Sequence, residues 1–180
     1  VGELIQVRDA ERDWEGAIER VLHAFGLSLL VPDQQYPAVA DWVERTHLRG
    51  RLVYYRVRDA ASGGHAELRP DSLVHKLAIQ PESRFYAWLE QALARRYDYA
   101  CCTDLQAFRR ETHALTRAGQ IKAGGERHEK DDRHRIDDRT RFILGWSNQN
   151  KIDALEHTAG ALSQRMQSID EQIEAHQQEA

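Results

Sequence analysis

Residues 17–22 read Ala-Ile-Glu-Arg-Val-Leu, and residues 88–93 read Trp-Leu-Glu-Gln-Ala-Leu; these two stretches indicate the fold. Each has apolar residues at helical spacing and a glutamate at the same place. In each half of the chain, a short apolar strand precedes the helix and another strand follows it. The sequence therefore predicts two similar lobes related by a pseudo-two-fold axis. The alternative is a chance similarity between two amphipathic helices.

The expected fold class is α+β, with the order strand, helix, strand, helix, strand in each half. Asp33 and Asp104 each follow a strand and are expected to cap the next helix, which in the second half should include Phe108 and Leu115. The Gly- and Ser-containing stretch between the halves predicts a linker. The expected domains are lobe 1 at 1–58, a linker at 59–76, lobe 2 with a charged loop at 77–146, and a helical arm at 147–180.

The C-terminal arm carries a heptad pattern. Its apolar residues follow one another at alternating spacings of three and four, the period of a coiled coil and not of a helix packed on a flat core. The alternative is a single helix packed on its own domain. A coiled coil needs a partner helix, which is expected to precede Val1 in a longer chain or to belong to another subunit. The seam residues are Ile152, Leu155, Ala159, Leu162, Met166, Ile169 and Ile173.

Composition excludes several classes of protein. The chain has 180 residues and a net charge of −4, so no global basic field attracts nucleic acid. No apolar run approaches the length needed to cross a bilayer, so no membrane association is expected. Cys101 and Cys102 are adjacent, which predicts two reduced thiols in a buried strand and a cytoplasmic location.

The charged run at 126–141 contains metal-ligand residue types, but arginine and lysine alternate with the acids. We expect a solvated, ion-paired loop without a metal site. The alternative is a nucleic-acid-binding or metal-dependent nuclease module in which Asp131 and Asp132 bind the metal. With no phosphate loop and no ordered catalytic triad, the chain is not expected to be an enzyme in itself, and no catalytic residue is assigned. The candidate DNA contacts are Arg127, Lys130, Arg133, Arg135 and Arg139.

Several of these stretches resemble a known family. Residues 2–5, 14–19, 29–31 and 50–55 resemble the first half of SMC hinge domains, and the ending at 118–125 is similar to the Gly-Gly ending of the family's second half. Residues 129–139, with Leu144-Gly145-Trp146, look like the MukB-like ATPase JetC of the Wadjet plasmid-defence condensins. The resemblance covers nearly the whole chain before the heptads.

The resemblance implies a hinge, the homodimerisation module of a condensin-type ATPase that acts on DNA in plasmid defence or chromosome organisation. ATP, magnesium and the ATPase heads would lie outside these residues, and so would kleisin-type accessory subunits. The coiled-coil partner would be the protein's own N-terminal arm helix. Hinges of this family pair edge strands of opposite lobes. Carried over, the interface would comprise Arg51, Leu52, Val53, Tyr54 and Tyr55 of one copy with Gln120, Ile121, Lys122, Gly124 and Gly125 of the other.

Overall fold

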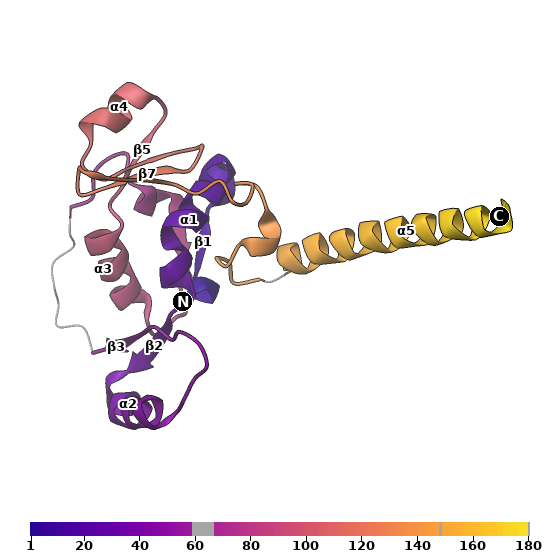
Figure 1. Ribbon diagram of the computed structural model, residues 1–180. Helices are drawn as coiled ribbons and strands as arrows, with labels where there is room; N and C mark the ends of the chain where they lie inside the picture. The colour runs from indigo at the N-terminus through magenta and orange to yellow at the C-terminus, as the bar shows by residue number, and fades with distance from the viewer. Residues whose placement is uncertain (59–66, 148, 180) are drawn as a thin grey trace. The chain divides into compact units, whose positions relative to one another are not determined.

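A computed structural model describes residues 1–58, 67–147 and 149–179, with the side chains of 152, 153 and 155–173 in the last stretch. Residues 59–66, most of the predicted linker's Gly and Ser, lie outside the described residues. The chain divides into two units (Figure 1). Unit 1 is Val1–Asp138 with Phe142–Trp146. Unit 2 contains α5 (Gln149–Glu179) and a 3-10 turn at Arg139–Arg141, so the arm predicted from the heptads is helical.

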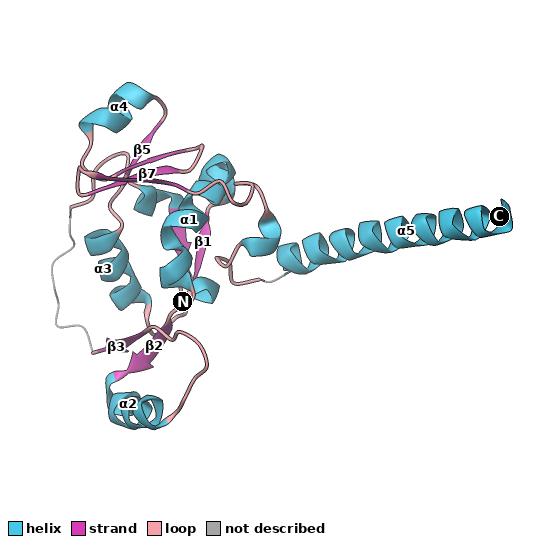
Figure 2. Ribbon diagram, in the orientation of Figure 1, coloured by secondary structure: helices cyan, strands magenta, loops and turns pink. Residues whose placement is uncertain are grey.

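Lobe 1 has the predicted order of elements (Figure 2). β2 and β3 are parallel neighbours, with Leu29 opposite Tyr54. The strand predicted at 51–57 is shorter than expected and begins at Tyr54. The elements are β1 (Ile5–Val7), α1 (Glu15–Gly26), β2 (Leu29–Pro32), α2 (Tyr36–Arg45) and β3 (Tyr54–Val57), with 3-10 turns at Gly2–Leu4, Asp9–Trp14 and Asp33–Gln35.

Lobe 2 repeats this order and then extends it. The prediction that Leu115 continues a helix is wrong, because the helix ends at Arg110 and the chain returns as a strand parallel to β5. Two further antiparallel strands complete a sheet of order β5-β6-β7-β8. The elements are a 3-10 turn at Leu73–Lys76, β4 (Leu77–Ile79), α3 (Tyr86–Arg96), β5 (Ala100–Cys102), α4 (Leu105–Arg110), β6 (Ala114–Thr116), β7 (Gln120–Ala123) and β8 (Arg127–Lys130).

The two lobes meet through their first strands. β1 pairs antiparallel with β4, and Gln6 lies opposite Ala78 at the middle of the pairing. Equivalent strands that pair antiparallel about their midpoints are related by a two-fold axis. The parallel pair β5–β6 in lobe 2 also corresponds to the pair β2–β3 in lobe 1. The two halves therefore share their order of elements and these strand pairings, and the pseudo-two-fold repeat stays a prediction.

The lobes share one hydrophobic core. Ile18 and Leu22 of α1 and Leu89 and Leu93 of α3 are fully buried in the same cluster. Leu73, within the predicted linker at 59–76, also has no exposed surface, and its backbone N–H donates to the carbonyl of Tyr99 at 2.9 Å. Residues 67–76 are therefore part of the folded unit, and each lobe depends on the other for burial.

The two predicted helix caps differ in outcome. Asp104 caps α4 by accepting from the N–H of Ala107 at 2.8 Å. Asp33 does not cap α2. Its carboxylate pairs with Arg56 and Arg58 of the β3 segment, which competes with the helix N–H groups.

We expect Asp104→Ala to lower the free energy of unfolding by about 1 kcal/mol, because α4 loses its capping acceptor. Asp33→Ala is the control at the equivalent repeat position and should leave protection of the α2 amides unchanged. Hydrogen exchange of the first-turn amides of the two helices checks both. Equal protection of the α4 amides in Asp104→Ala and wild type would contradict the cap.

Candidate dimerisation edge and charged strap

The strand predicted to pair with a partner, β3, has one occupied and one open side among the described residues. β2 occupies one side, and no strand that the structure describes pairs with the other. Arg51, Leu52 and Val53, predicted as part of the interface, precede the strand, whereas Tyr54 and Tyr55 lie in it. An open strand edge carries unpaired N–H and C=O groups and is a template for another strand.

The backbone of β3 shows which groups face the open side. The N–H of Leu29 donates to the carbonyl of Val53 at 3.0 Å, so Val53 faces β2. Successive residues of a strand point their backbone groups to alternate sides. Tyr54 and Arg56 therefore direct their N–H and C=O groups toward the open edge.

Aromatic and arginine side chains fix both faces of β3. The Tyr54 ring contacts Tyr36 at 6.4 Å between centroids, and the Arg56 guanidinium lies 4.5 Å from the Tyr36 centroid. On the opposite face, Arg96 lies 4.6 Å from the centroid of Tyr55. The hydrogen bond from Arg56 is the main cause that holds the pKa of Asp33 below its usual value. These contacts restrain the side chains on both faces of the strand.

The second predicted interface strand is not an edge. Gln120, Ile121 and Lys122 lie in β7, which is paired with β6 on one side and β8 on the other. Ile121 and Lys122 are buried, and the Lys122 amine donates to the carbonyl of Arg109 at 2.9 Å. The expectation that Gln120–Lys122 forms an open edge is wrong, because the charged residues that follow it fold back as β8. β8 is an outer strand of this sheet, and all four of its residues are exposed.

Gly124 and Gly125 form the turn between β7 and β8. Their φ angles are +68° and +84°, a conformation that glycine adopts without strain. A Cβ at either position would meet no atom within 4 Å. The turn itself accounts for both glycines, and their predicted contact with a partner stays a prediction.

The charged run at 126–141 is paired mainly within itself. Arg127, Lys130, Arg133 and Arg135 each pair with a carboxylate two residues away along the chain. Their hydrogen bonds are the main cause of the lowered pKa values of Asp131, Asp132 and Asp137. Arg139 also has a partner. These four cations are thus largely neutralised, and their DNA contact stays an untested prediction.

Sequence reasoning missed a different feature of the charged run. After β8 the chain crosses α1, forming what we call the strap, residues 131–138 and 142–146. Glu19 is buried, and its carboxylate accepts from the N–H groups of Ile143 at 3.0 Å and Leu144 at 2.9 Å. A glutamate between Ile18 and Leu22, with Gly16 nearby in the same helix, is the signal that could have indicated a backbone packed on this face.

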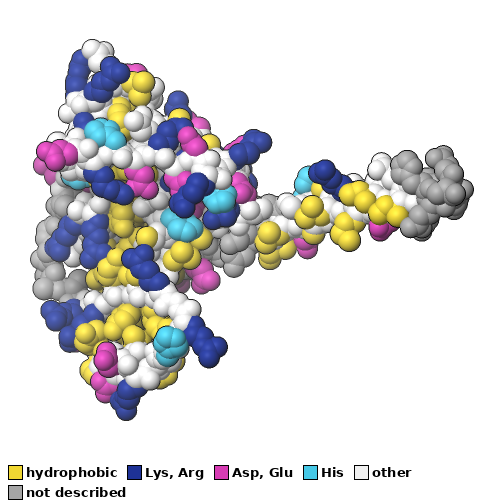
Figure 3. All heavy atoms as spheres, viewed as in Figure 1, with side chains coloured by type: hydrophobic (Ala, Val, Ile, Leu, Met, Phe, Trp, Pro, Cys, Tyr) yellow, Lys and Arg dark blue, Asp and Glu magenta, His cyan; other side chains and the backbone are white. Residues whose placement is uncertain are grey.

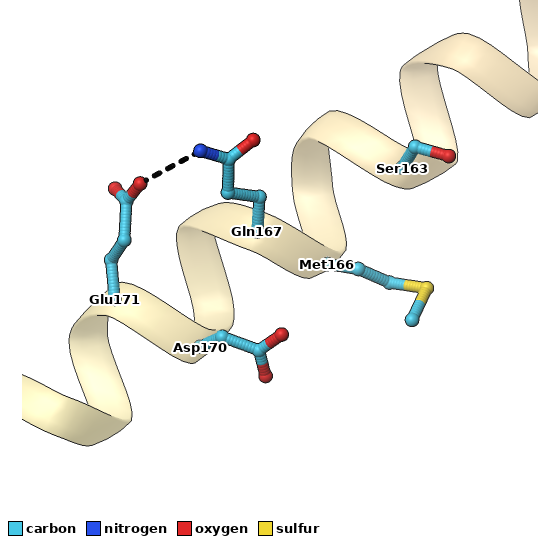
Figure 4. A pocket seen from close by; sticks show the side chains of 5 residues that line it. All are labelled: Ser163, Met166, Gln167, Asp170 and Glu171. Atoms are coloured by element: carbon cyan, nitrogen blue, oxygen red, sulfur yellow. Dashed lines mark hydrogen bonds between the residues drawn. The ribbon is translucent and has the colours of Figure 1, made fainter.

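The predicted coiled-coil seam is exposed in the described part of α5. Ile152, Leu155, Leu162, Met166, Ile169 and Ile173 are 44–66% exposed, and Figure 3 shows hydrophobic side chains along the helix. Figure 4 shows a shallow hollow lined by Ser163, Met166, Gln167, Asp170 and Glu171, in which Gln167 donates to Glu171. All these residues belong to one helix, so the hollow is open surface of the kind that a second helix covers.

The described residues also bear on three other possibilities: a reactive thiol, a metal site and a membrane-spanning helix. Burial is the main cause that raises the pKa of the Cys101 thiol to about 12, so Cys101 is protonated and unreactive at neutral pH. Among the described residues, no three His, Cys, Asp or Glu side chains gather where they could hold a metal ion. Within the same residues, no helix is long and apolar enough to span a membrane.

One solved structure, titled "Folded elbow of cohesin", contains a chain with a similar fold. The match covers 94% of this chain and 26% of that chain, with 19% sequence identity and a TM-score of 0.51. No family model and no curated protein matches the sequence. The fold is thus a mixed α+β fold with small sheets and a C-terminal helix, similar to that of part of the matched chain. This chain spans about a quarter of the matched chain's length, and the narrower resemblance to JetC stays a prediction.

Proposed function

We propose that this chain is the hinge of an SMC-like ATPase, the module through which two copies dimerise. The internal repeat supports this most directly. In lobe 2, β6 has β5 on one side and β7 antiparallel on the other. Its counterpart β3 has β2 on the equivalent first side and no described strand on the second. In lobe 2, β7 thus pairs with the side of β6 that corresponds to the open side of β3. In lobe 1, a second copy of the chain would supply the strand at this position.

The strand that a second copy would offer is β8. It is an end strand of its sheet and carries no neighbour on its far side among the described residues. Each copy would then contribute one β3 edge and one β8 edge. Two such contacts related by a two-fold axis form a closed dimer, in which each edge is covered.

Exposed apolar side chains next to β3 favour burial of this region. Leu29 in β2 is 52% exposed, Leu27 just before it is 61% exposed, and Trp42 of α2 is 57% exposed. Figure 3 shows hydrophobic side chains gathered over lobe 1. Apolar surface around an open strand edge is typical of an interface.

The ends of unit 1 support the role of a module that carries arms. The N–H of Gly145 donates to the carbonyl of Gly2 at 3.0 Å, so the first residues lie beside the last residues before α5. A helix entering at Val1 would start near the exit toward α5, as an antiparallel coiled-coil arm requires. The parent ATPase, with its heads and kleisin-type subunits, would act on DNA in plasmid defence or chromosome organisation.

Tyr54→Pro tests the proposed edge. Proline removes the N–H that faces the open side, and the dimer contains this contact twice. At about 1 kcal/mol for each hydrogen bond, we expect dimer affinity to fall at least about 30-fold in a sedimentation dilution series.

Tyr54→Thr is the matched control. It removes the ring that contacts Tyr36 but keeps the N–H and the β propensity, so the dimer should persist. Equal affinities of the proline and threonine variants would rule out backbone pairing at this edge.

A further inference from the structure

The strap lies on one face of α1, and its first half is held by two residues. Arg20 donates to the carbonyl of His134 at 2.8 Å and lies 3.6 Å from the carboxylate of Asp132. Gly16 allows the carbonyl of Ile136 to approach so closely that a Cβ at this position would overlap it.

The second half of the strap returns along the same helix face. Glu19 accepts from two successive backbone N–H groups, those of Ile143 and Leu144. The Ile143 side chain lies against Gly26, where a Cβ would meet its Cδ1 atom at 2.5 Å. The Glu19 carboxylate and Gly16 thus accept the strap backbone, and Gly26 accepts the Ile143 side chain, where an ordinary amphipathic helix presents side chains of its own.

Most of the residues that form this face of α1 are absent from the equivalent positions of α3 in lobe 2. When residues 17–22 are matched with 88–93, the positions of Gly16, Arg20 and Gly26 are taken by Ala87, Gln91 and Tyr97. Only the glutamate is kept, as Glu90. Both lobes fold with the same order of elements, so that order does not require the glycines and the arginine of α1, which contact the strap.

We propose that the contact between the strap and this face of α1, which we call the clasp, can open. The strap dissociates from α1 as a unit while both lobes stay folded, and the Glu19 carboxylate holds it in place. The opposite side of α1, with Ile18 and Leu22, is fully buried, whereas Ile136 and Leu144 of the strap are only partly buried. Contacts with little apolar burial open before the core does. The proposal does not depend on dimerisation.

Hydrogen exchange of the whole 180-residue chain tests the clasp in Glu19→Gln. A glutamine offers one oxygen in place of two and loses the charge that strengthens both bonds. The amides of Ile143 and Leu144 should exchange at least about tenfold faster than in wild type, and those of Leu22 and Leu93 should be unchanged. Glu90→Gln is the matched control from lobe 2, and it should leave Ile143 and Leu144 at the wild-type rate.

Arg20→Gln tests whether the strap moves as a unit, and it introduces the residue that lobe 2 has at this position. It breaks the contacts to Asp132 and His134 and none to Ile143 or Leu144 that the structure describes, yet a unit that opens together should also expose Ile143 and Leu144 to faster exchange. The clasp is overturned if Glu19→Gln leaves the exchange of these two amides unchanged. It is equally overturned if their exchange rises only together with that of Leu22 and Leu93, or if Arg20→Gln affects neither of them.

Discussion

Phe25→Ala is expected to lower the free energy of unfolding by about 3–5 kcal/mol and to leave a single unfolding transition. Phe25 is 1% exposed at the end of α1 in lobe 1. Its ring lies 6.4 Å from Trp88 and 5.2 Å from Tyr97, both in lobe 2. The cavity left by alanine would therefore remove contacts that join the lobes, and both should lose stability together.

Thermal unfolding followed by circular dichroism and calorimetry measures this effect. A domain of this size loses roughly 2–4 °C in Tm for each kcal/mol, so Tm should fall by about 10 °C. Trp42→Ala is the control, since that aromatic side chain is 57% exposed and its loss should cost less than about 1 kcal/mol. Two separated transitions, one for each lobe, would contradict a shared core.

Gly16→Ala is expected to destabilise the protein by about 1–3 kcal/mol, the reverse of what helix propensity predicts. In a free helix, alanine would be favoured over glycine by roughly 0.5–1 kcal/mol. Here the new Cβ would overlap the carbonyl of Ile136 in the strap, which is backbone and cannot rotate away. Chemical denaturation with urea measures the difference.

Ala87→Gly provides the opposite test, because Ala87 is the equivalent residue of α3. There the change should cost only the helix propensity, about 0.5–1 kcal/mol. A stabilising effect of Gly16→Ala would show that the strap does not pack closely on α1.

The parts of the fold that follow local patterns could be predicted from the sequence. The amphipathic faces at 17–22 and 88–93 predicted both central helices, and the heptads predicted a helix that the structure describes as Gln149–Glu179. The repeat also predicted equivalent strands, which the structure places as β2 and β5.

The parts that depend on distant contacts could not be predicted. Residues 127–130, Arg-His-Glu-Lys, have no apolar alternation, and they form a strand only because β7 lies beside them. Leu115 fits a helix pattern and a strand equally well, and the parallel neighbour Cys101 decides the outcome. Glu19 binds Ile143 and Leu144 across more than a hundred residues, a distance that no local pattern spans.

The predicted interface shows both what local patterns predict and what depends on distant contacts. Tyr54 and Tyr55 are β-formers in a strand that has one open side among the described residues, so local propensity indicated the strand, and its pairing with a partner stays a prediction. Gln120–Lys122 was also identified correctly as a strand, but whether a strand is an edge depends on what folds beside it. A sequence predicts strands more readily than it predicts edges.

Sedimentation velocity of the 180-residue chain across a wide dilution range tests the hinge proposal most directly. Two copies joined through paired β3 and β8 edges should sediment at twice the chain mass and stay so as the protein is diluted. A particle of single-chain mass at every concentration, with the lobes folded by circular dichroism, would contradict dimerisation as the function of this module.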